Sequence, residues 1–143
     1  MVKRVLLVDD CVEVLFGLKL LLQKSCLDVA GEAETCAEAL QFVRTNLVDL
    51  ILLDLNLPDG HGLQVLPQIR AHQPGVPVVV HSSSDSATDL LLSYKLGAQG
   101  YLVKGLDSPE HLLDTIRRAC DGEAVWTNDQ LDRVERHKKN VSH

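Results

Sequence analysis

The sequence predicts one doubly wound α/β domain, in which a parallel sheet of five strands is flanked by five helices. Short aliphatic runs alternate with longer amphipathic stretches along the chain, which is the pattern of repeated βα units. Three of the five runs are apolar at consecutive positions, as expected of strands that are covered on both faces. The chain has 143 residues, which is enough for one hydrophobic core rather than several.

Five aliphatic runs define the expected strands, at residues 5–8, 29–33, 50–53, 78–80 and 101–103. Only 3% of the residues are aromatic, so we expect the core between the sheet and its helices to be built from Leu, Val, Ile and Ala. A domain of about 150 residues buries roughly 68–70% of the surface that its unfolded chain exposes. An aliphatic core of this size is therefore sufficient for the predicted fold.

The helix that follows the first strand carries two apolar stripes. The expected core face consists of Val14, Leu18, Leu21 and Leu22. The second stripe lies nearly opposite and consists of Val12, Phe16 and Leu20. Exposed aliphatic side chains are common on globular proteins, which is one interpretation of the second stripe. The other interpretation is a homodimer surface, formed by this stripe together with Leu113 of the fifth helix.

Capping residues mark the other helices. Residues 35–38 form a Thr-Cys-Ala-Glu capping box that opens the second helix. Pro67 lies inside the apolar pattern of residues 63–72, which predicts a kink or a late start for the third helix. Gly97 supplies a C-terminal stop for the fourth helix. The sequence Ser-Pro-Glu at residues 108–110 supplies an N-cap, a first-turn proline and a first-turn acid for the fifth.

A change of composition divides the chain into a predicted domain over residues 1–122 and a tail over residues 123–143. The tail has four acidic and four Lys or Arg residues, so the net charge of −6 belongs to the first part. A helix over residues 128–140 would have only Leu131 and Val134 as its apolar stripe. We therefore expect a linker or a short C-terminal helix in the tail.

Composition also excludes some functions. With 20 acidic against 14 basic residues, the chain lacks the basic surface of a general nucleic-acid binder. No apolar run reaches the ~20 residues that cross a bilayer, and the first strand begins too early for a signal peptide. The four cysteines form no CxxC pair and have no histidine at metal-ligand spacing. We expect a cytoplasmic protein with reduced thiols and no membrane partner.

Polar side chains end four of the five expected strands. In a doubly wound sheet, functional groups gather outside the carboxyl ends of the strands. The residues at these ends are Asp9, Asp10, Asp54, Ser82 and Lys104. A single strand-end aspartate is often a helix N-cap or a turn residue, but one cap needs only one carboxylate, and Asp9 and Asp10 are adjacent. The set therefore indicates a functional site.

The chemistry of this set follows from its charges. Three carboxylates at one edge repel one another, and a hard divalent cation such as Mg²⁺ offsets that repulsion. A carboxylate can also act as a nucleophile and form an aspartyl-phosphate. The new phosphoryl group carries about −1.5 to −2 charges, so it needs a cation, a lysine and a hydroxyl donor nearby. All of these except the cation are supplied by the strand ends.

The motifs resemble the receiver domain of two-component response regulators over about residues 2–122. They are VLLVDD at 5–10, LLDLNLP at 52–58, VHS at 80–82 and GYLVK at 100–104. Gly-Glu-Ala at 31–33 and KLGAQGY at 95–101 further resemble the NarL/FixJ branch, whose outputs are LuxR-type helix-turn-helix domains. The resemblance implies a flavodoxin-like fold with strand order 2-1-3-4-5, a Mg²⁺ cofactor and a sensor histidine kinase as partner.

The resemblance also implies roles at the acidic edge. Asp54 would accept the phosphoryl group from a phosphohistidine of the kinase. Asp10, Asp54 and the backbone carbonyl of Asn56 would bind Mg²⁺ directly, while Asp9 would hold a metal-bound water. The domain would not turn over a substrate as an enzyme does, beyond its own phosphorylation and dephosphorylation.

Three further residues have roles implied by the resemblance. Ser82 would donate a hydrogen bond to the phosphoryl oxygen, and Lys104 would pair with the phosphoryl group. Tyr101 would turn inward as Ser82 moves, which makes Ser82 and Tyr101 the expected switch. Many receivers have a proline after the lysine, and this chain has Gly105 there, as is frequent in the NarL/FixJ branch.

Other functions remain open at this stage. An aspartyl-phosphate phosphatase generally has a second acid two residues after its nucleophile, where this chain has Asn56. A flavodoxin-like FMN binder would need aromatic residues around the flavin, and the whole chain has five. The tail is too short for a helix-turn-helix module, so DNA would be contacted only through an output domain that is not in this chain. A stand-alone receiver that acts through protein contacts is the alternative.

Overall fold

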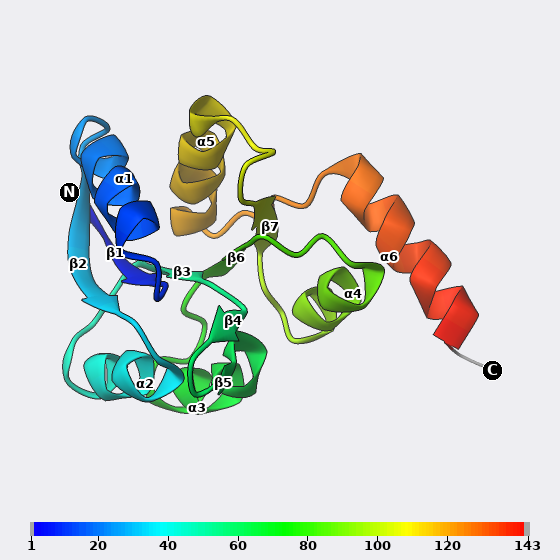
Figure 1. The fold of residues 1–143 in the computed structure, drawn as a ribbon, viewed down its shortest axis with the longest axis horizontal. Coiled ribbons are helices and arrows are strands. Elements are labelled where there is room, and N and C mark those ends of the chain that lie inside the picture. Colours follow the sequence, from blue (N-terminus) through cyan, green and yellow to red (C-terminus); the bar gives the residue numbers. More distant parts are fainter. Residues whose placement is uncertain (1, 142–143) are drawn as a thin grey trace.

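A five-stranded parallel sheet organises residues 2–141, which is the part of the chain that the computed structural model describes (Figure 1). Its strands are β1 (Lys3–Val8), β2 (Leu27–Ala33), β3 (Leu50–Leu53), β6 (Val78–Ser82) and β7 (Gly100–Val103). The order across the sheet is β2-β1-β3-β6-β7. Counted among these five strands alone, this is the predicted order 2-1-3-4-5, so the fold prediction is confirmed.

Helices cover both faces of the sheet. In Figure 1, α1 (Val12–Gln23) and α5 (Pro109–Cys120) lie above it, and α2, α3 and α4 lie below it. The three lower helices are α2 (Cys36–Thr45), α3 (Leu66–His72) and α4 (Ala87–Lys95). The central strands β1, β3 and β6 therefore lie between two apolar layers, which explains why their sequences are apolar at consecutive positions.

The core has two parts, one on each face of the sheet. Leu6 and Leu53 belong to the part between the sheet and α2, α3 and α4. Leu7 and Leu52 belong to the part between the sheet and α1 and α5. Side chains of successive strand residues point to opposite faces, so one continuous aliphatic run fills both parts. Among the largest fully buried side chains of residues 2–141, Tyr101 is the only aromatic one, which agrees with the predicted aliphatic core.

The predicted helix starts are confirmed by their caps. The Thr35 hydroxyl accepts a hydrogen bond from the Glu38 backbone N–H at 3.0 Å. The Ser108 hydroxyl accepts one from the His111 N–H at 3.1 Å. A 3₁₀ turn, η1 (Gly62–Gln64), precedes α3, and Pro67 lies in the first turn of α3. Proline is favourable there because its missing N–H has no partner within the helix, and the third helix starts late as predicted.

Two local features differ from the sequence expectations or were absent from them, and the tail takes the second of its two expected forms. The buried side chains of α1 are Leu15, Leu18 and Leu22, whereas Val14 and Leu21 are half-buried, so the predicted core stripe was rotated by part of a turn. A short antiparallel pair, β4 (Asn56–Leu57) and β5 (Gly60–His61), follows β3 and was not predicted. The tail contains a regular helix, α6 (Asn128–Val141), which lies beside α4 (Figure 1).

Candidate functional site

Three carboxylates meet at the carboxyl edge of the sheet. β1 ends at Val8 and β3 ends at Leu53, and these two residues are partners in adjacent parallel strands. Asp9 and Asp54 follow them directly and are both buried, while Asp10 is exposed. One carboxylate oxygen from each of the three aspartates lies within 4.8 Å of the others. The predicted acidic cluster is therefore present.

Backbone bonds hold the two buried aspartates in place. The Asp9 N–H donates to Ala33 O and the Asp54 N–H donates to Val8 O, both at 2.9 Å, so the sheet ladder continues through these residues. The N-cap of α1 is Cys11, which has no side-chain cap bond. Asp10 is thus not the N-cap of this helix, so capping does not explain why an aspartate stands at this position.

Lys104 bridges the two buried carboxylates. Its ammonium lies 2.6 Å from Asp9 Oδ2 and 3.0 Å from Asp54 Oδ2. The Lys104 backbone N–H donates to Ser82 O at 2.8 Å, which anchors the residue beyond the end of β7. Burial lowers the pKa of Lys104, but its contacts with the two aspartates outweigh burial and raise that pKa above its ordinary value. Lys104 therefore stays charged and neutralises part of the cluster.

Asp54 remains electrostatically costly despite this partner. Burial raises the pKa of Asp54 above its ordinary value, and Lys104 offsets only part of that effect. The Asn56 N–H donates to Asp54 Oδ1 at 3.3 Å. Asp54 Oδ2, like the second oxygen of Asp9, is oriented toward the Lys104 ammonium rather than toward a backbone donor. The carboxylate is thus held at the edge in a form that an added cation would stabilise.

The donor set fits an oxygen-preferring divalent cation. Asp9 Oδ2 is buried and makes no bond of hydrogen-bond geometry with any described residue, although the Lys104 ammonium is close to it. Carboxylate oxygens are the ligands that Mg²⁺ and Ca²⁺ prefer, and Mg²⁺ typically takes one or two carboxylates together with water. An exposed Asp10 beside two buried aspartates leaves room for such water.

Ser82 and Tyr101 lie beyond the cluster on adjacent strands. Both side chains are buried, and Tyr101 is already directed inward, with its hydroxyl donating to Ser84 O at 2.6 Å. The Ser82 hydroxyl accepts from the Ser84 N–H at 3.2 Å. Burial raises the pKa of Tyr101 to about 12, so this hydroxyl keeps its proton. The two predicted switch residues are thereby linked through one loop residue.

His81 adds no positive charge to this edge at neutral pH. Its side chain is buried, and burial lowers its pKa to about 4, with the nearby Lys104 ammonium acting in the same direction. Lys104 is therefore the one cation that the described residues place against Asp9 and Asp54.

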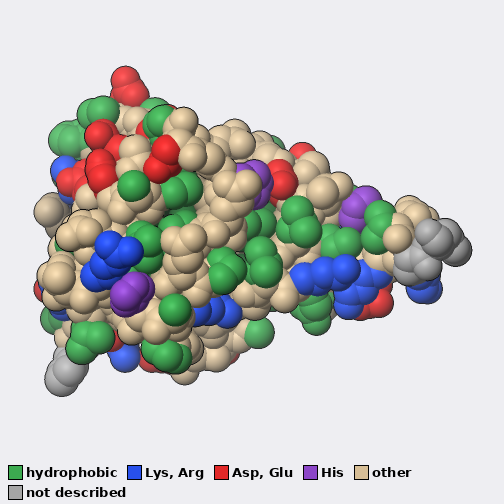
Figure 2. Space-filling model, turned by 90° about the horizontal axis from the view of Figure 1, so that it is seen from below, with side chains coloured by type: hydrophobic (Ala, Val, Ile, Leu, Met, Phe, Trp, Pro, Cys, Tyr) green, Lys and Arg blue, Asp and Glu red, His purple; other side chains and the backbone are tan. Residues whose placement is uncertain are grey.

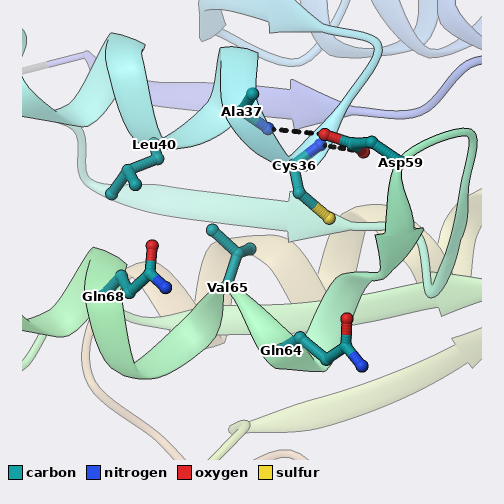
Figure 3. Close-up of a pocket in the computed structure, with 7 residues that line it drawn as sticks. All are labelled: Cys36, Ala37, Leu40, Asp59, Gln64, Val65 and Gln68. Carbon is teal, nitrogen blue, oxygen red and sulfur yellow. Dashed lines mark hydrogen bonds between the residues drawn. The ribbon is translucent and has the colours of Figure 1, made fainter.

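Two residues near the site were missed by sequence reasoning. The Asp59 carboxylate accepts bonds from the Cys36 and Ala37 N–H groups at 2.8 and 3.0 Å, so the loop after β3 is tied to the start of α2 (Figure 3). These residues border a cavity of about 290 Å³ between α2 and α3. Gly62 packs so closely against the Asp54 backbone that an added Cβ would overlap the Asp54 carbonyl oxygen. The sequence showed only that this residue is a glycine. The same loop contains Gly60, which already accounts for a turn, so Gly62 did not stand out.

The sheet, the acidic cluster and the bridging lysine together define a receiver-type α/β domain. The family described as response regulator receiver domain matches residues 5–117. The chain therefore belongs to this family, as its motifs predicted. No helix in the described range 2–141 is long and apolar enough to cross a membrane.

Known relatives are consistent with the predicted branch. The nitrate/nitrite response regulator protein NarL of Escherichia coli (strain K12) is 36% identical over 122 residues, which are 85% of this chain and 56% of that protein. The chain thus spans about half the length of the curated relatives it matches. The receiver domain of the putative response regulator NarL from Mycobacterium tuberculosis is 26% identical, with a TM-score of 0.78 over 85% of this chain and 98% of that one.

The structure of a CheY-like receiver domain protein from Methanospirillum hungatei JF-1 is also similar to this chain. It is 29% identical, with a TM-score of 0.78 over 85% of this chain and 96% of that one. These likenesses confirm the receiver fold, and the curated relatives confirm the NarL-like branch.

Proposed function

We propose that Asp54 accepts a phosphoryl group from a phosphohistidine of a sensor kinase and that the receiver changes conformation in response. An Asp54 carboxylate oxygen attacks phosphorus, the N–P bond of the phosphohistidine breaks, and its electron pair returns to the imidazole. The observation that carries the proposal is the Lys104 ammonium, which contacts both Asp9 and Asp54 inside a cluster of three carboxylates. This lysine is placed to neutralise charge on an acyl phosphate at Asp54.

Mg²⁺ is the proposed cofactor. Asp10, Asp54 and the backbone carbonyl of Asn56 would hold it directly, and Asp9 would hold one of its waters. When bound, the ion supplies positive charge to the transferring phosphoryl oxygens. Lys104 supplies a second positive charge. Its ammonium already offsets part of the charge of Asp9 and Asp54 before a phosphoryl group arrives.

Ser82 and Tyr101 are the proposed switch. A phosphoryl group at Asp54 would draw the Ser82 hydroxyl toward its oxygens by a charge-assisted hydrogen bond. That movement would break the bond from the Ser84 N–H to Ser82, and Ser84 in turn holds the Tyr101 hydroxyl. The face formed by α4, β7 and α5 would then change shape.

The substitution Asp54→Asn is expected to abolish phosphorylation by acetyl phosphate with Mg²⁺, because an amide oxygen is not a competent nucleophile here. Intact-mass spectrometry should show one added phosphoryl group on the wild-type protein and none on the variant. The variant should be at least as stable as the wild type at pH 7: burial raises the pKa of Asp54, so its ionised form destabilises the folded state. Stoichiometric labelling of the variant would reject Asp54 as the acceptor.

The same preparation separates this function from an aspartyl-phosphate phosphatase. A receiver should release at most the phosphate that it carries, whereas a phosphatase would hydrolyse a generic phosphomonoester over many turnovers. Multiple turnovers that are lost in Asp54→Asn would favour the phosphatase.

The proposed output is control of transcription in the cytoplasm. The support is that the matched relatives are named as response regulators and transcriptional regulators and are about one and a half times as long as this chain. In this proposal residues 1–122 are the receiver, residues 123–143 lead toward an output domain outside the chain, and DNA is contacted only there. A stand-alone receiver that acts through protein contacts is the alternative.

We further propose that the second stripe of α1 is a homodimer surface. Val12, Phe16 and Leu20 are 66%, 61% and 46% exposed, which is unusual for three large apolar side chains on one helix face. Leu113 of α5 is half-buried, and α5 packs beside α1 on this side of the sheet.

Phe16→Glu is expected to abolish the dimer, because a carboxylate placed in an apolar interface must lose its hydration. Sedimentation velocity over a range of concentrations measures the monomer and dimer populations. Leu47→Glu is the control, since Leu47 is also highly exposed but lies between α2 and β3. A dimer population that Phe16→Glu leaves unchanged, or that Leu47→Glu removes equally, contradicts the proposal.

A further inference from the structure

The segment that connects α5 to α6 is fastened to the start of β7. The Val125 N–H donates to Gln99 O at 2.6 Å, and the Gln99 side chain donates to Glu123 O at 3.1 Å. Val125 is buried, and a Cβ added at Gly100 would lie 2.6 Å from its Cγ2. α6 therefore leaves the sheet from a fixed point.

Trp126 joins this segment to the switch tyrosine. Its indole N–H donates to Ala98 O at 2.9 Å. Its ring lies 5.6 Å from Tyr94 of α4 in an edge-on arrangement and 6.2 Å from Tyr101 of β7. Such aromatic pairs are favourable beyond the area they bury, and they depend on the positions of both rings. A displacement of Tyr101 would thus change its packing against the Trp126 ring.

α6 itself covers α4. Val134 is the one buried side chain of α6 and belongs to the core beneath α4. The Lys138 ammonium lies 5.0 Å from the centre of the Tyr94 ring, and His137 is hydrogen-bonded to the Thr88 hydroxyl at 3.2 Å. Figure 2 shows that the end of the helix extends beyond the body of the protein. The contact thus combines one buried apolar side chain with a cation–π contact and polar bonds, and polar bonds of this kind can be exchanged for bonds to water when the helix undocks.

The polar contacts of α6 end on the elements that the proposed switch moves. The Gln130 side chain donates to Tyr101 O at 2.8 Å, and the Arg133 guanidinium donates to Asp85 O at 2.6 Å. Asp85 lies in the loop after β6, next to Ser84, which holds both the Ser82 and Tyr101 hydroxyls. One short loop therefore connects the predicted phosphoryl-binding hydroxyl to the docking of α6.

We infer that α6 is the intramolecular occupant of the surface formed by α4 and β7, and that phosphorylation of Asp54 releases it. This inference rests on the proposed function. When Ser82 turns toward a phosphoryl oxygen, Ser84 and Asp85 move with it, the Arg133 bond is lost, and Tyr101 shifts against Trp126. Release exposes Val134 and uncovers more of Tyr94 and Trp126, so the whole surface becomes available to a partner only in the phosphorylated state.

Trp126 makes this release measurable, because it is the only tryptophan of the chain. The full chain is treated with acetyl phosphate and Mg²⁺, or with beryllofluoride and Mg²⁺, and phosphoryl incorporation is followed by mass. We expect acrylamide quenching of Trp126 to increase and hydrogen exchange of the α6 amides to accelerate by about fivefold or more, which is the lower end of common allosteric couplings. Asp54→Asn should show neither change with acetyl phosphate.

Two variants test the coupling from the other side. Val134→Asp should undock α6 without phosphorylation and, because coupling is reciprocal, should tighten beryllofluoride binding by the factor by which phosphorylation weakens docking. Arg133→Ala removes only the Asp85 bond and should act in the same direction, to a smaller extent. Val141→Asp is the matched control, since it makes the same substitution at an exposed position of the same helix and should change nothing.

The outcomes separate the inference from the proposed function. If no phosphoryl group is incorporated at Asp54, the proposed function is wrong, and this inference is overturned with it. If the group is incorporated but quenching and α6 exchange stay unchanged, the inference alone is overturned. Equal effects of Val134→Asp and Val141→Asp on beryllofluoride binding would also overturn it.

Discussion

Lys104→Met is expected to lose most phosphorylation of Asp54 and to make folding depend on a divalent cation. Among the residues that the structure describes, the Lys104 ammonium is the cation in contact with Asp9 and Asp54. The variant therefore keeps two buried carboxylates but loses the positive charge that offsets them. Removing one partner of a fully buried ion pair costs ~3–5 kcal/mol, and since Lys104 is 20% exposed we expect about 2–3 kcal/mol. The loss of a preorganised cation should slow phosphorylation on the order of 10²-fold.

Urea unfolding with EDTA and with excess Mg²⁺ measures the stability effect. The variant should recover more stability from Mg²⁺ than the wild type does, because the ion replaces the missing positive charge. Lys19→Met is the control: Lys19 forms an exposed ion pair with Glu32 at 3.3 Å, and such pairs are worth only about 0–1 kcal/mol. Equal Mg²⁺ stabilisation of the wild type and Lys104→Met would contradict the placement of the ion at this cluster.

Gly62→Ala is expected to damage the site although Gly62 has no functional group. A Cβ at this position would overlap the Asp54 carbonyl oxygen and would lie 3.2 Å from Leu55 Cα, so the backbone after β3 must move. Overpacking of this kind typically costs about 1–3 kcal/mol. Displacement of a reacting group by about 1 Å can slow a reaction on the order of 10²-fold, so phosphorylation should fall far more than stability alone explains.

Gly17→Ala makes the same substitution in α1, where nothing lies within 4 Å of the added Cβ. This control should be more stable by about 0.5–1 kcal/mol, because alanine favours a helix interior over glycine. Phosphorylation rates and urea unfolding should be measured for both variants at a temperature where both are folded. A folded Gly62→Ala protein that is phosphorylated at the wild-type rate would show that the backbone of Asp54 tolerates the shift.

Much of the fold could be predicted because its signals are local. The central strands β1, β3 and β6 are apolar at consecutive positions, and helix starts carry their own caps at Thr35 and Ser108. Asp9, Asp54 and Lys104 could be assigned to one edge because parallel strands all end on the same side of a sheet. The α1 core face was predicted with an error of part of a turn, because successive helix positions differ by only about 100° and eight of the twelve residues of that helix are apolar.

Other features of the site depend on residues distant in sequence. Asp59 accepts bonds from the first N–H groups of α2 although β3 and β4 lie between them in the sequence, and the importance of Gly62 arises from its close approach to the Asp54 backbone on the other side of the β4–β5 pair. α6 has too few apolar residues for its position to be predicted. Its docking is instead directed by single contacts of Trp126, Gln130 and Arg133 to backbone carbonyls elsewhere.

By itself, the sequence determined the order of the elements, the two-sided burial of the strands and the chemical groups at the carboxyl edge, since each follows from residue type and short-range periodicity. Only the tertiary structure decided that Lys104 spans Asp9 and Asp54, that Gly62 limits the position of Asp54, and that α6 covers α4. The physical reason is that ångström-scale distances between side chains are set by packing across the whole sheet, and no local pattern encodes them.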